Sequence, residues 1–247
     1  MRFPLGPLAF ALMALPAHGF DIQSMTDAER AAFGDAVRAY LLAHPEILVD
    51  VGQALQAKQD AEQAKGDAAM IAANAAEIFA DANSYVGGNP EGDITLVEFL
   101  DYRCAYCRKA HGDVAELVSS DGNIRYLVKE FPILGDQSVV ASRFAIAALK
   151  VAGPEAYAKI NAGFYESFRG DVTEATLSTF ATGLGIDPAP ILAEMSSDEV
   201  TQIIAANHAL AEKLQISGTP TFVLSDQMLR GFVPLSAMRE IVAKARG

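Results

Sequence analysis

The stretch ITLVEFLDYRCAYCR, residues 94–108, contains the features that decide the fold. Its first seven residues form a nearly continuous apolar run, which predicts a central β-strand covered on both faces. The only two cysteines of the 247-residue chain, Cys104 and Cys107, follow directly. They open a predicted helix that ends near Asp121 and Gly122. The sequence therefore predicts a buried strand that leads into a helix with both thiols in its first turn.

The spacing and the position of the two cysteines favour redox chemistry. Residues three apart share one face of a helix, so Cys104 and Cys107 can join as a disulfide. Unpaired backbone N–H groups at a helix N-terminus stabilise negative charge, which lowers a thiol pKa and favours the nucleophilic thiolate. We expect the thiol pKa of Cys104 to be lowered most and its sulfur to stay exposed, and we expect Cys107 to be more shielded from solvent.

Three other roles would also use a pair of cysteines. A structural staple contributes little, because a loop of about four residues gains about 2 kcal/mol, against ~4.7 kcal/mol for a loop of 100. Zinc as a rule needs four ligands, and the chain offers the two thiols and His111. A Cu(I) site on the two sulfurs stays chemically reasonable. We predict redox catalysis without a cofactor or a metal site, and a Cu(I)-binding or holdase module remains the alternative.

Charged residues surround the cysteines in an otherwise acidic sequence. Four basic or titratable residues either stabilise the thiolate or form a solvated helix face: Arg103, Arg108, Lys109 and His111. Glu98 lies inside the apolar strand, where a buried carboxylate is costly unless it has a partner or a function. Burial would raise its pKa and suit it to exchange a proton with Cys107. The alternative is a glutamate at an edge or with its hydrogen bonds satisfied.

The rest of the chain predicts further elements of an α/β domain. A loop is expected over 85–93, and residues 124–128 alternate as a second strand. Helical patterns fill 138–214, a hairpin is expected over 219–230, and a last helix over 235–246. The order is strand, helix, strand, helical insert, hairpin, helix.

These residues resemble the DsbA family of thioredoxin-fold thiol:disulfide oxidoreductases. The resemblance rests on the strand, the CxxC helix, the helical insert and ISGTPTFVL at 216–224. FLDYRCAYCRKAH at 99–111 and KEFPILG at 129–135 are most similar to the branch that includes the ScsC proteins. It implies a thioredoxin fold with an all-helical insertion, preceded by an N-terminal helical segment.

The resemblance also implies roles for individual residues. Cys104 would be the attacking thiol, Cys107 the resolving thiol and Glu98 the buried acid. Pro220, usually cis in the family, would form the substrate-binding turn. Thr219, Ala105 and Tyr106 would lie beside it. The Ala-Tyr dipeptide differs from the Pro-His of strong oxidases, and threonine before the proline is similar to isomerase-type members, so the direction of exchange, oxidase or isomerase and reductase, stays open.

The N-terminal third predicts export and a helical stalk. Residues 1–19 contain one basic residue, an apolar stretch and small residues before a cut at Phe20, which is typical of a cleaved signal peptide and of a periplasmic protein. Thr26 and Glu29 fit a capping box for a helix that ends near Ala43. A second helix over 47–82 keeps a heptad rhythm of alanine and isoleucine, which favours oligomerisation or, alternatively, a plain packed helix. The domains predicted are 1–19, 20–85 and 86–247.

Composition narrows the partners. A net charge of −12 and a pI of about 4.7 argue against nucleic acid, because nucleic-acid binding depends on a basic surface. No apolar stretch outside the N-terminus is long enough to span a bilayer. The expected partners are exported polypeptides with cysteines, a membrane redox protein that resets the pair, and further copies of the chain through the N-terminal helices.

Overall fold

The computed structural model describes residues 24–247, so the predicted signal peptide lies outside the described residues. The chain divides into two compact units, residues 1–58 and 59–247. Within the described residues, no helix is long and apolar enough to cross a membrane.

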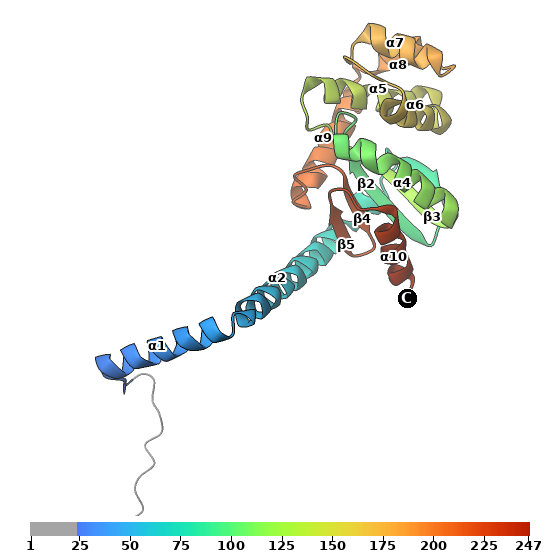
Figure 1. The fold of residues 1–247 in the computed structure, drawn as a ribbon. Coiled ribbons are helices and arrows are strands. Elements are labelled where there is room, and N and C mark those ends of the chain that lie inside the picture. Colours follow the sequence, from blue (N-terminus) through green and yellow to red (C-terminus); the bar gives the residue numbers. More distant parts are fainter. Residues whose placement is uncertain (1–23) are drawn as a thin grey trace, which may run out of the picture. The chain divides into compact units, whose positions relative to one another are not determined.

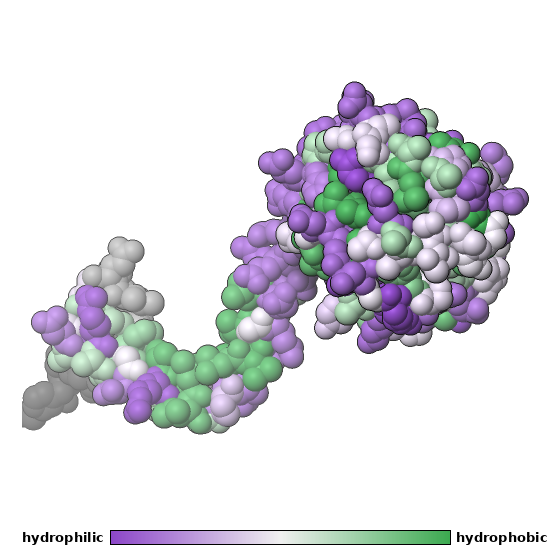
Figure 2. Space-filling view, turned by 90° about the horizontal axis from the view of Figure 1, so that it is seen from above, coloured by the Kyte–Doolittle hydropathy of each residue, from purple (hydrophilic) through white to green (hydrophobic). Residues whose placement is uncertain are grey.

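The first unit consists of helix α1 (Asp27–Ala43) and the start of α2 (Glu46–Ala73). The predicted capping box is present: the Glu29 backbone N–H donates to the Thr26 hydroxyl over 3.3 Å, and the Thr26 N–H donates to the Glu29 carboxylate over 2.9 Å. No residue of α1 is buried. Large apolar side chains are exposed along this unit (Figure 2): Phe33, Val37, Tyr40, Leu42, Leu48, Val49, Val51 and Leu55.

The predicted helix over 47–82 is confirmed as far as Ala73, but it is interrupted at Asn74 and helical structure ends at Phe79. Helix α2 ends at Ala73 and a short helix α3 (Ala75–Phe79) follows. The break lies at Asn74, whose side-chain amide donates to the Met70 carbonyl over 2.8 Å and so competes with the backbone ladder. Ile71 and Ile78, which continue the heptad rhythm, are buried in the core of the second unit. The last apolar residues of the heptad pattern therefore belong to the core of the second unit.

The second unit is built on a five-stranded sheet in the order β1-β3-β2-β4-β5. Strand β2 (Ile94–Leu100) lies at the centre, parallel to β3 (Ile124–Glu130) and antiparallel to β4 (Thr221–Leu224). Strand β5 (Gln227–Arg230) completes the predicted hairpin.

The loop predicted over 85–93 is partly wrong, because β1 (Tyr85–Gly88) pairs antiparallel with β3. Its two glycines hid the strand from pattern analysis, since glycine is depleted in strands. Gly88 has a φ of +66°, and a Cβ there would lie 2.4 Å from the carbonyl oxygen of Ile124. Only glycine lets the chain pass β3 this closely.

Helices cover both faces of the sheet (Figure 1). Helix α4 (Ala105–Asp121) and helix α10 (Leu235–Arg246) pack on one face, against Leu96 of β2 and Phe222 of β4. The other face, with Val97 and Phe99, is covered by the end of α9, the end of α2 and α3. Strand β2 is therefore buried on both faces, as its apolar run predicts.

The predicted helical insert is confirmed as five helices between β3 and β4. They are α5 (Asp136–Ala152), α6 (Pro154–Glu166), α7 (Glu174–Gly183), α8 (Pro188–Glu194) and α9 (Asp198–Lys213). The core of the insert extends to Tyr102 and Cys107, so the insert packs directly on the cysteine pair. The predicted fold class, a thioredoxin fold with an all-helical insertion after an N-terminal helical segment, is confirmed.

Candidate active site

The two cysteines lie at different depths of the same helix end. Cys104 is the N-cap residue of α4 and Cys107 lies in its first turn. Cys107 is fully buried, as expected. The expectation that Cys104 stays exposed is wrong, because only 8% of its surface is accessible. Between them, the side chain of Tyr106 is 61% exposed.

The pKa values of the two thiols are displaced in opposite directions. A hydrogen bond from the Cys107 thiol is the largest cause that lowers the pKa of Cys104, to about 5, although burial opposes it. The Thr219 side chain and the backbone N–H groups of Cys107 and Tyr106 contribute further. The same hydrogen bond, then burial and the Glu98 carboxylate, hold the pKa of Cys107 far above its usual range. Near neutral pH the pair has one thiolate, at Cys104, and one thiol, at Cys107.

The basic and titratable side chains near the pair in the sequence contact groups other than the two thiols. Arg103 donates to the Gly170 carbonyl over 3.1 Å, and Arg108 donates to the Tyr165 carbonyl. The Lys109 ammonium lies 4.1 Å from the centre of the Phe232 ring, and His111 lies 3.4 Å from a carboxylate oxygen of Glu166. Their side chains therefore brace the surroundings of the site, and the main causes of the thiol pKa shifts are the hydrogen bonds described above.

The loop before β4 reaches the sulfur of Cys104. The Thr219–Pro220 peptide bond is cis, as the resemblance implies. In its protonated form the Cys104 thiol donates a hydrogen bond to the Thr219 carbonyl over 3.2 Å. Pairing of Phe222 with Glu98 fixes this loop relative to β2, and the Pro220 carbonyl accepts from the Gly231 N–H over 2.8 Å. An extended polypeptide that docks beside Pro220 would therefore meet the Cys104 sulfur.

Glu98 lies beneath the pair, on the face of β2 that α4 covers. Only 3% of its surface is accessible. Burial is the largest cause that raises the pKa of its carboxyl to about 7, and the charges of Glu130 and Cys104 add to it. The Tyr126 hydroxyl donates to Glu98 and opposes the shift. A carboxyl that titrates near neutral pH beside a buried thiol is suited to proton transfer.

A second buried acid, Glu130, was not singled out in the sequence. It accepts hydrogen bonds from Tyr157 over 2.6 Å, from Tyr102 over 2.7 Å and from Ser142 over 2.7 Å. Burial is the largest cause that raises its pKa to about 7. Its place at the end of an alternating strand was the only sequence signal, and two of its three partners, Tyr157 and Ser142, come from the insert.

Asp101, also missed, is fully buried and holds the loop before Cys104. It accepts from the Arg103 N–H over 2.7 Å, from the Ile133 N–H over 2.8 Å and from the Ser138 hydroxyl over 2.8 Å. Within residues 24–247 no group of three or more His, Cys, Asp or Glu side chains is placed to hold a metal ion.

Comparisons with known proteins agree with this geometry. Residues 80–244 match the family model described as thioredoxin. The chain belongs to the thioredoxin family. Residues 29–62 match a second model, the N-terminal domain of the copper resistance protein ScsC. The predicted resemblance to the DsbA-like and ScsC-like oxidoreductases is confirmed.

Three solved structures illustrate the similarity of this thioredoxin-family chain. A thioredoxin-like oxidoreductase from Silicibacter pomeroyi DSS-3 is 40% identical, with 69% of this chain and 96% of that chain covered and a TM-score of 0.64. The thiol-disulfide exchange protein α-DsbA2 from Wolbachia pipientis is 25% identical over 74% and 97% of the chains, with a TM-score of 0.69. BcfH from Salmonella enterica Typhimurium is 27% identical over 89% and 97%, with a TM-score of 0.71.

The first curated relatives are much longer than this chain. The chain is 26% identical to a Na(+)/H(+) antiporter NhaA 1 from Salinispora arenicola over 65% of this chain, and it spans about a quarter of that protein's length, 24%. It is 20% identical to the disulfide bond formation protein D of Bacillus subtilis over 64% of this chain and 74% of that protein.

Proposed function

We propose that this chain is an exported thiol:disulfide oxidoreductase that exchanges disulfides with cysteines of other periplasmic or secreted proteins. The observation that carries the proposal is the Cys104 sulfur, which has a lowered pKa at a helix N-cap and lies 3.2 Å from the Thr219 carbonyl beside Pro220. Thiol-disulfide relatives of the same family support it.

The mechanism follows from the asymmetry of the pair. To reduce a substrate, the Cys104 thiolate attacks its disulfide, forms a mixed disulfide and releases one substrate thiolate. Cys107 then loses its proton to Glu98 and attacks Cys104, which closes the Cys104–Cys107 disulfide and frees the second thiolate. To oxidise a substrate, the steps run in reverse, and Glu98 returns the proton as Cys107 leaves.

The lowered pKa of Cys104 bears on the direction. A stabilised thiolate favours the reduced form of the pair, which makes its disulfide oxidising. We therefore propose that the pair donates or rearranges disulfides in preference to reducing them, and that a membrane redox partner resets it. The side chains of Ala105 and Tyr106 are exposed and would contact the substrate.

A trapping experiment tests the attacking residue. In a Cys107→Ser variant, Cys104 is expected to accumulate a mixed disulfide with a scrambled disulfide protein, identified by mass spectrometry. The matched Cys104→Ser variant should form no adduct and lose catalysis. Adducts at Cys107 in the Cys104→Ser variant, or catalysis without Cys104, would contradict the proposal.

The first unit is proposed to hold copies of the chain together. Its helices have no buried residue before Asp67, and large apolar side chains such as Tyr40, Leu42 and Leu48 are exposed. Removal of residues 24–58 is the suitable test, because residues 67–78 belong to the core of the second unit. The shortened chain should be monomeric by light scattering and should lose reshuffling of a scrambled protein while it still oxidises a reduced peptide. Equal loss of both activities, or of neither, would count against this role.

Cu(I) binding remains a second candidate, favoured by the match of residues 29–62 to a copper resistance protein's N-terminal domain. The two hydrogen-bonded sulfurs of Cys104 and Cys107 offer a soft ligand pair. Competition with a chromogenic Cu(I) chelator tests it, with the double serine variant as control. Equal Cu(I) retention by both proteins would exclude the cysteines as ligands.

A further inference from the structure

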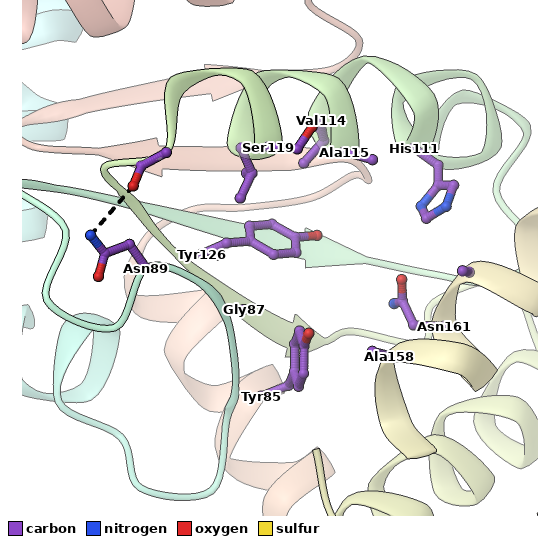
Figure 3. A pocket seen from close by; sticks show the side chains of 14 residues that line it. Tyr85, Gly87, Asn89, His111, Val114, Ala115, Ser119, Tyr126, Ala158 and Asn161 are labelled. Atoms are coloured by element: carbon purple, nitrogen blue, oxygen red, sulfur yellow. Dashed lines mark hydrogen bonds between the residues drawn. The ribbon is translucent and has the colours of Figure 1, made fainter. Parts of the chain in front are cut away.

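A cavity of about 480 Å³ opens on the second unit between β1, α4 and α6 (Figure 3). Its walls include Tyr85 of β1, His111 of α4 and Ala158 of α6, and Tyr126 of β3 lies at its base. Neither cysteine is among its lining residues. The cavity is thus separate from the surface beside Pro220 and Cys104.

One side chain connects this cavity to the buried acid beneath the cysteines. The ring of Tyr126 lines the cavity and its hydroxyl donates to a carboxylate oxygen of Glu98. The second acid is reached less directly: Asn161, also in the wall, donates to the Tyr102 hydroxyl over 3.2 Å, and Tyr102 donates to Glu130 over 2.7 Å. Only the Tyr126 path places a single hydroxyl between the cavity and an acid.

Resolution of a mixed disulfide poses a problem that the cavity would solve. When a protein is joined to Cys104, its chain covers the surface beside Thr219 and Pro220. Cys107, fully buried, must then lose a proton, and Glu98 is 3% exposed. The proton that Glu98 accepts needs a way out that the bound protein does not block.

We propose that the cavity beside α4 is a rear proton route, in which Tyr126 relays protons between Glu98 and solvent water while a protein substrate covers Cys104. The inference rests on the proposed function. In the reductive direction, the Cys107 thiol gives its proton to Glu98 as its sulfur attacks Cys104. Protonated Glu98 then donates to the Tyr126 oxygen while the Tyr126 hydroxyl proton passes to water in the cavity. The substrate leaves as a thiolate, and oxidation of a substrate moves the proton inward.

The groups that face Glu98 are compatible with this role. Tyr126 and Glu130 come from β3, Cys104 and Cys107 from the start of α4, and Tyr165 from α6. On β4, its paired residue is the apolar Phe222. The Glu98 pKa of about 7 lets the carboxyl hold and release a proton near neutral pH.

His111 lines the cavity together with the two tyrosines, Tyr85 and Tyr126. Its side chain is 18% exposed and lies 3.4 Å from Glu166. Burial is the largest cause that lowers its pKa. A largely neutral imidazole does not repel the positive charge of a proton that passes from Tyr126 to water in the cavity.

The test compares a covering substrate with a small one. Stopped-flow rates of the reduced full-length chain are measured with insulin and with oxidised glutathione, for wild type and Tyr126→Phe. The variant should slow turnover of insulin by about tenfold or more, since a positioned proton-transfer group contributes roughly 10²- to 10⁴-fold and cavity water replaces part of the relay. Turnover of glutathione should change little, because this small disulfide leaves most of the surface beside Cys104 open to water. A larger solvent isotope effect with insulin is also expected.

Two controls separate the route from a packing defect. Tyr85→Phe removes a hydroxyl from the same cavity that, in the described residues, contacts neither acid, and it should behave as wild type. Ala158→Leu fills the cavity without touching Tyr126 chemistry and should slow insulin selectively, whereas Ala175→Leu on the exposed face of α7 should not. Two results would overturn the inference. One is that Tyr126→Phe slows turnover of insulin and of glutathione equally. The other is that neither Tyr126→Phe nor Ala158→Leu slows turnover of insulin. A Cys104→Ser variant that turns over both substrates as fast as wild type would overturn the proposed function itself.

Discussion

The hydrogen bond between the two thiols is open to a direct test by removal of Cys107. In the folded chain this bond is the largest contribution that brings the Cys104 pKa from 9.0 to about 5. A hydrogen bond to a charged group is worth about 1.5–3 kcal/mol and one pKa unit corresponds to 1.36 kcal/mol, so its loss should raise the pKa by about one to two units. Cys107→Ala is therefore expected to titrate at Cys104 between about 6 and 7.

Alkylation provides the assay. At pH 6 a thiol with a pKa of about 5 is roughly nine-tenths thiolate, and one with a pKa of about 7 is roughly one-tenth, so the rate with iodoacetamide should fall by up to about tenfold. Cys107→Ser keeps a donor and should fall less, which makes it the matched control. Thiolate absorbance across pH 3–9 gives the midpoints independently.

Two results would refute this reasoning. An unchanged midpoint in Cys107→Ala would show that the N–H groups of Tyr106 and residue 107 suffice. A wild-type midpoint near 8 or 9 would show that Cys104 is an ordinary buried thiol, and the oxidising character proposed for the pair would lose its basis.

Three further predictions concern the reduced pair and the core. Between pH 6 and 8, of the two thiols of the reduced pair, only Cys107 keeps its proton, so the reduction potential measured against glutathione should fall by about 30 mV per pH unit. Below pH 5 both thiols are protonated, and the slope should be about 59 mV per pH unit. A slope of about 59 mV per pH unit over the whole range would contradict the assignment. Glu130 has a raised pKa in the folded chain, so its contribution to stability is present below pH 4.5 and is lost as pH rises through about 7. The free energy of unfolding in urea should accordingly vary less with pH between 5 and 8 for Glu130→Gln than for wild type. An equally steep pH dependence in the variant would exclude Glu130 as its cause. Ile78→Ala should cost about 2–5 kcal/mol in unfolding free energy, because Ile78 is fully buried; a loss below 1 kcal/mol would place α3 outside the core.

Much of the fold could be predicted because its signals are local. The apolar run at 94–100, the alternation at 124–128 and the turn at Ser225 each fix an element from neighbouring residues. Strand β1 escaped prediction because its partner lies about forty residues away and its sequence ends in Gly87–Gly88, which reads as a turn. The heptad pattern could not distinguish a stalk from a core, since both require an apolar stripe.

The site divides in the same way. Cys104, Cys107 and Glu98 lie within ten residues of one another, so their spacing on a strand and a helix was informative. The burial of Cys104 could not be foreseen, because the Thr219 carbonyl that covers it comes from a separate part of the chain. Glu130 required Tyr157 and Ser142 from two helices of the insert, contacts that no spacing pattern encodes.

The two thiols are controlled through different parts of the fold. Cys104 owes its low pKa to groups at the helix end, among them the backbone N–H of Tyr106, whose contribution does not depend on the identity of that side chain. Cys107 is governed from below, by burial and by Glu98. On the proposed mechanism, attack and resolution are therefore separable: the helix end would set how readily Cys104 reacts, and Glu98 with Tyr126 would set how readily Cys107 follows. The exposed side chains of Ala105 and Tyr106 belong to neither network, so we propose that they act on the direction of exchange through the bound substrate.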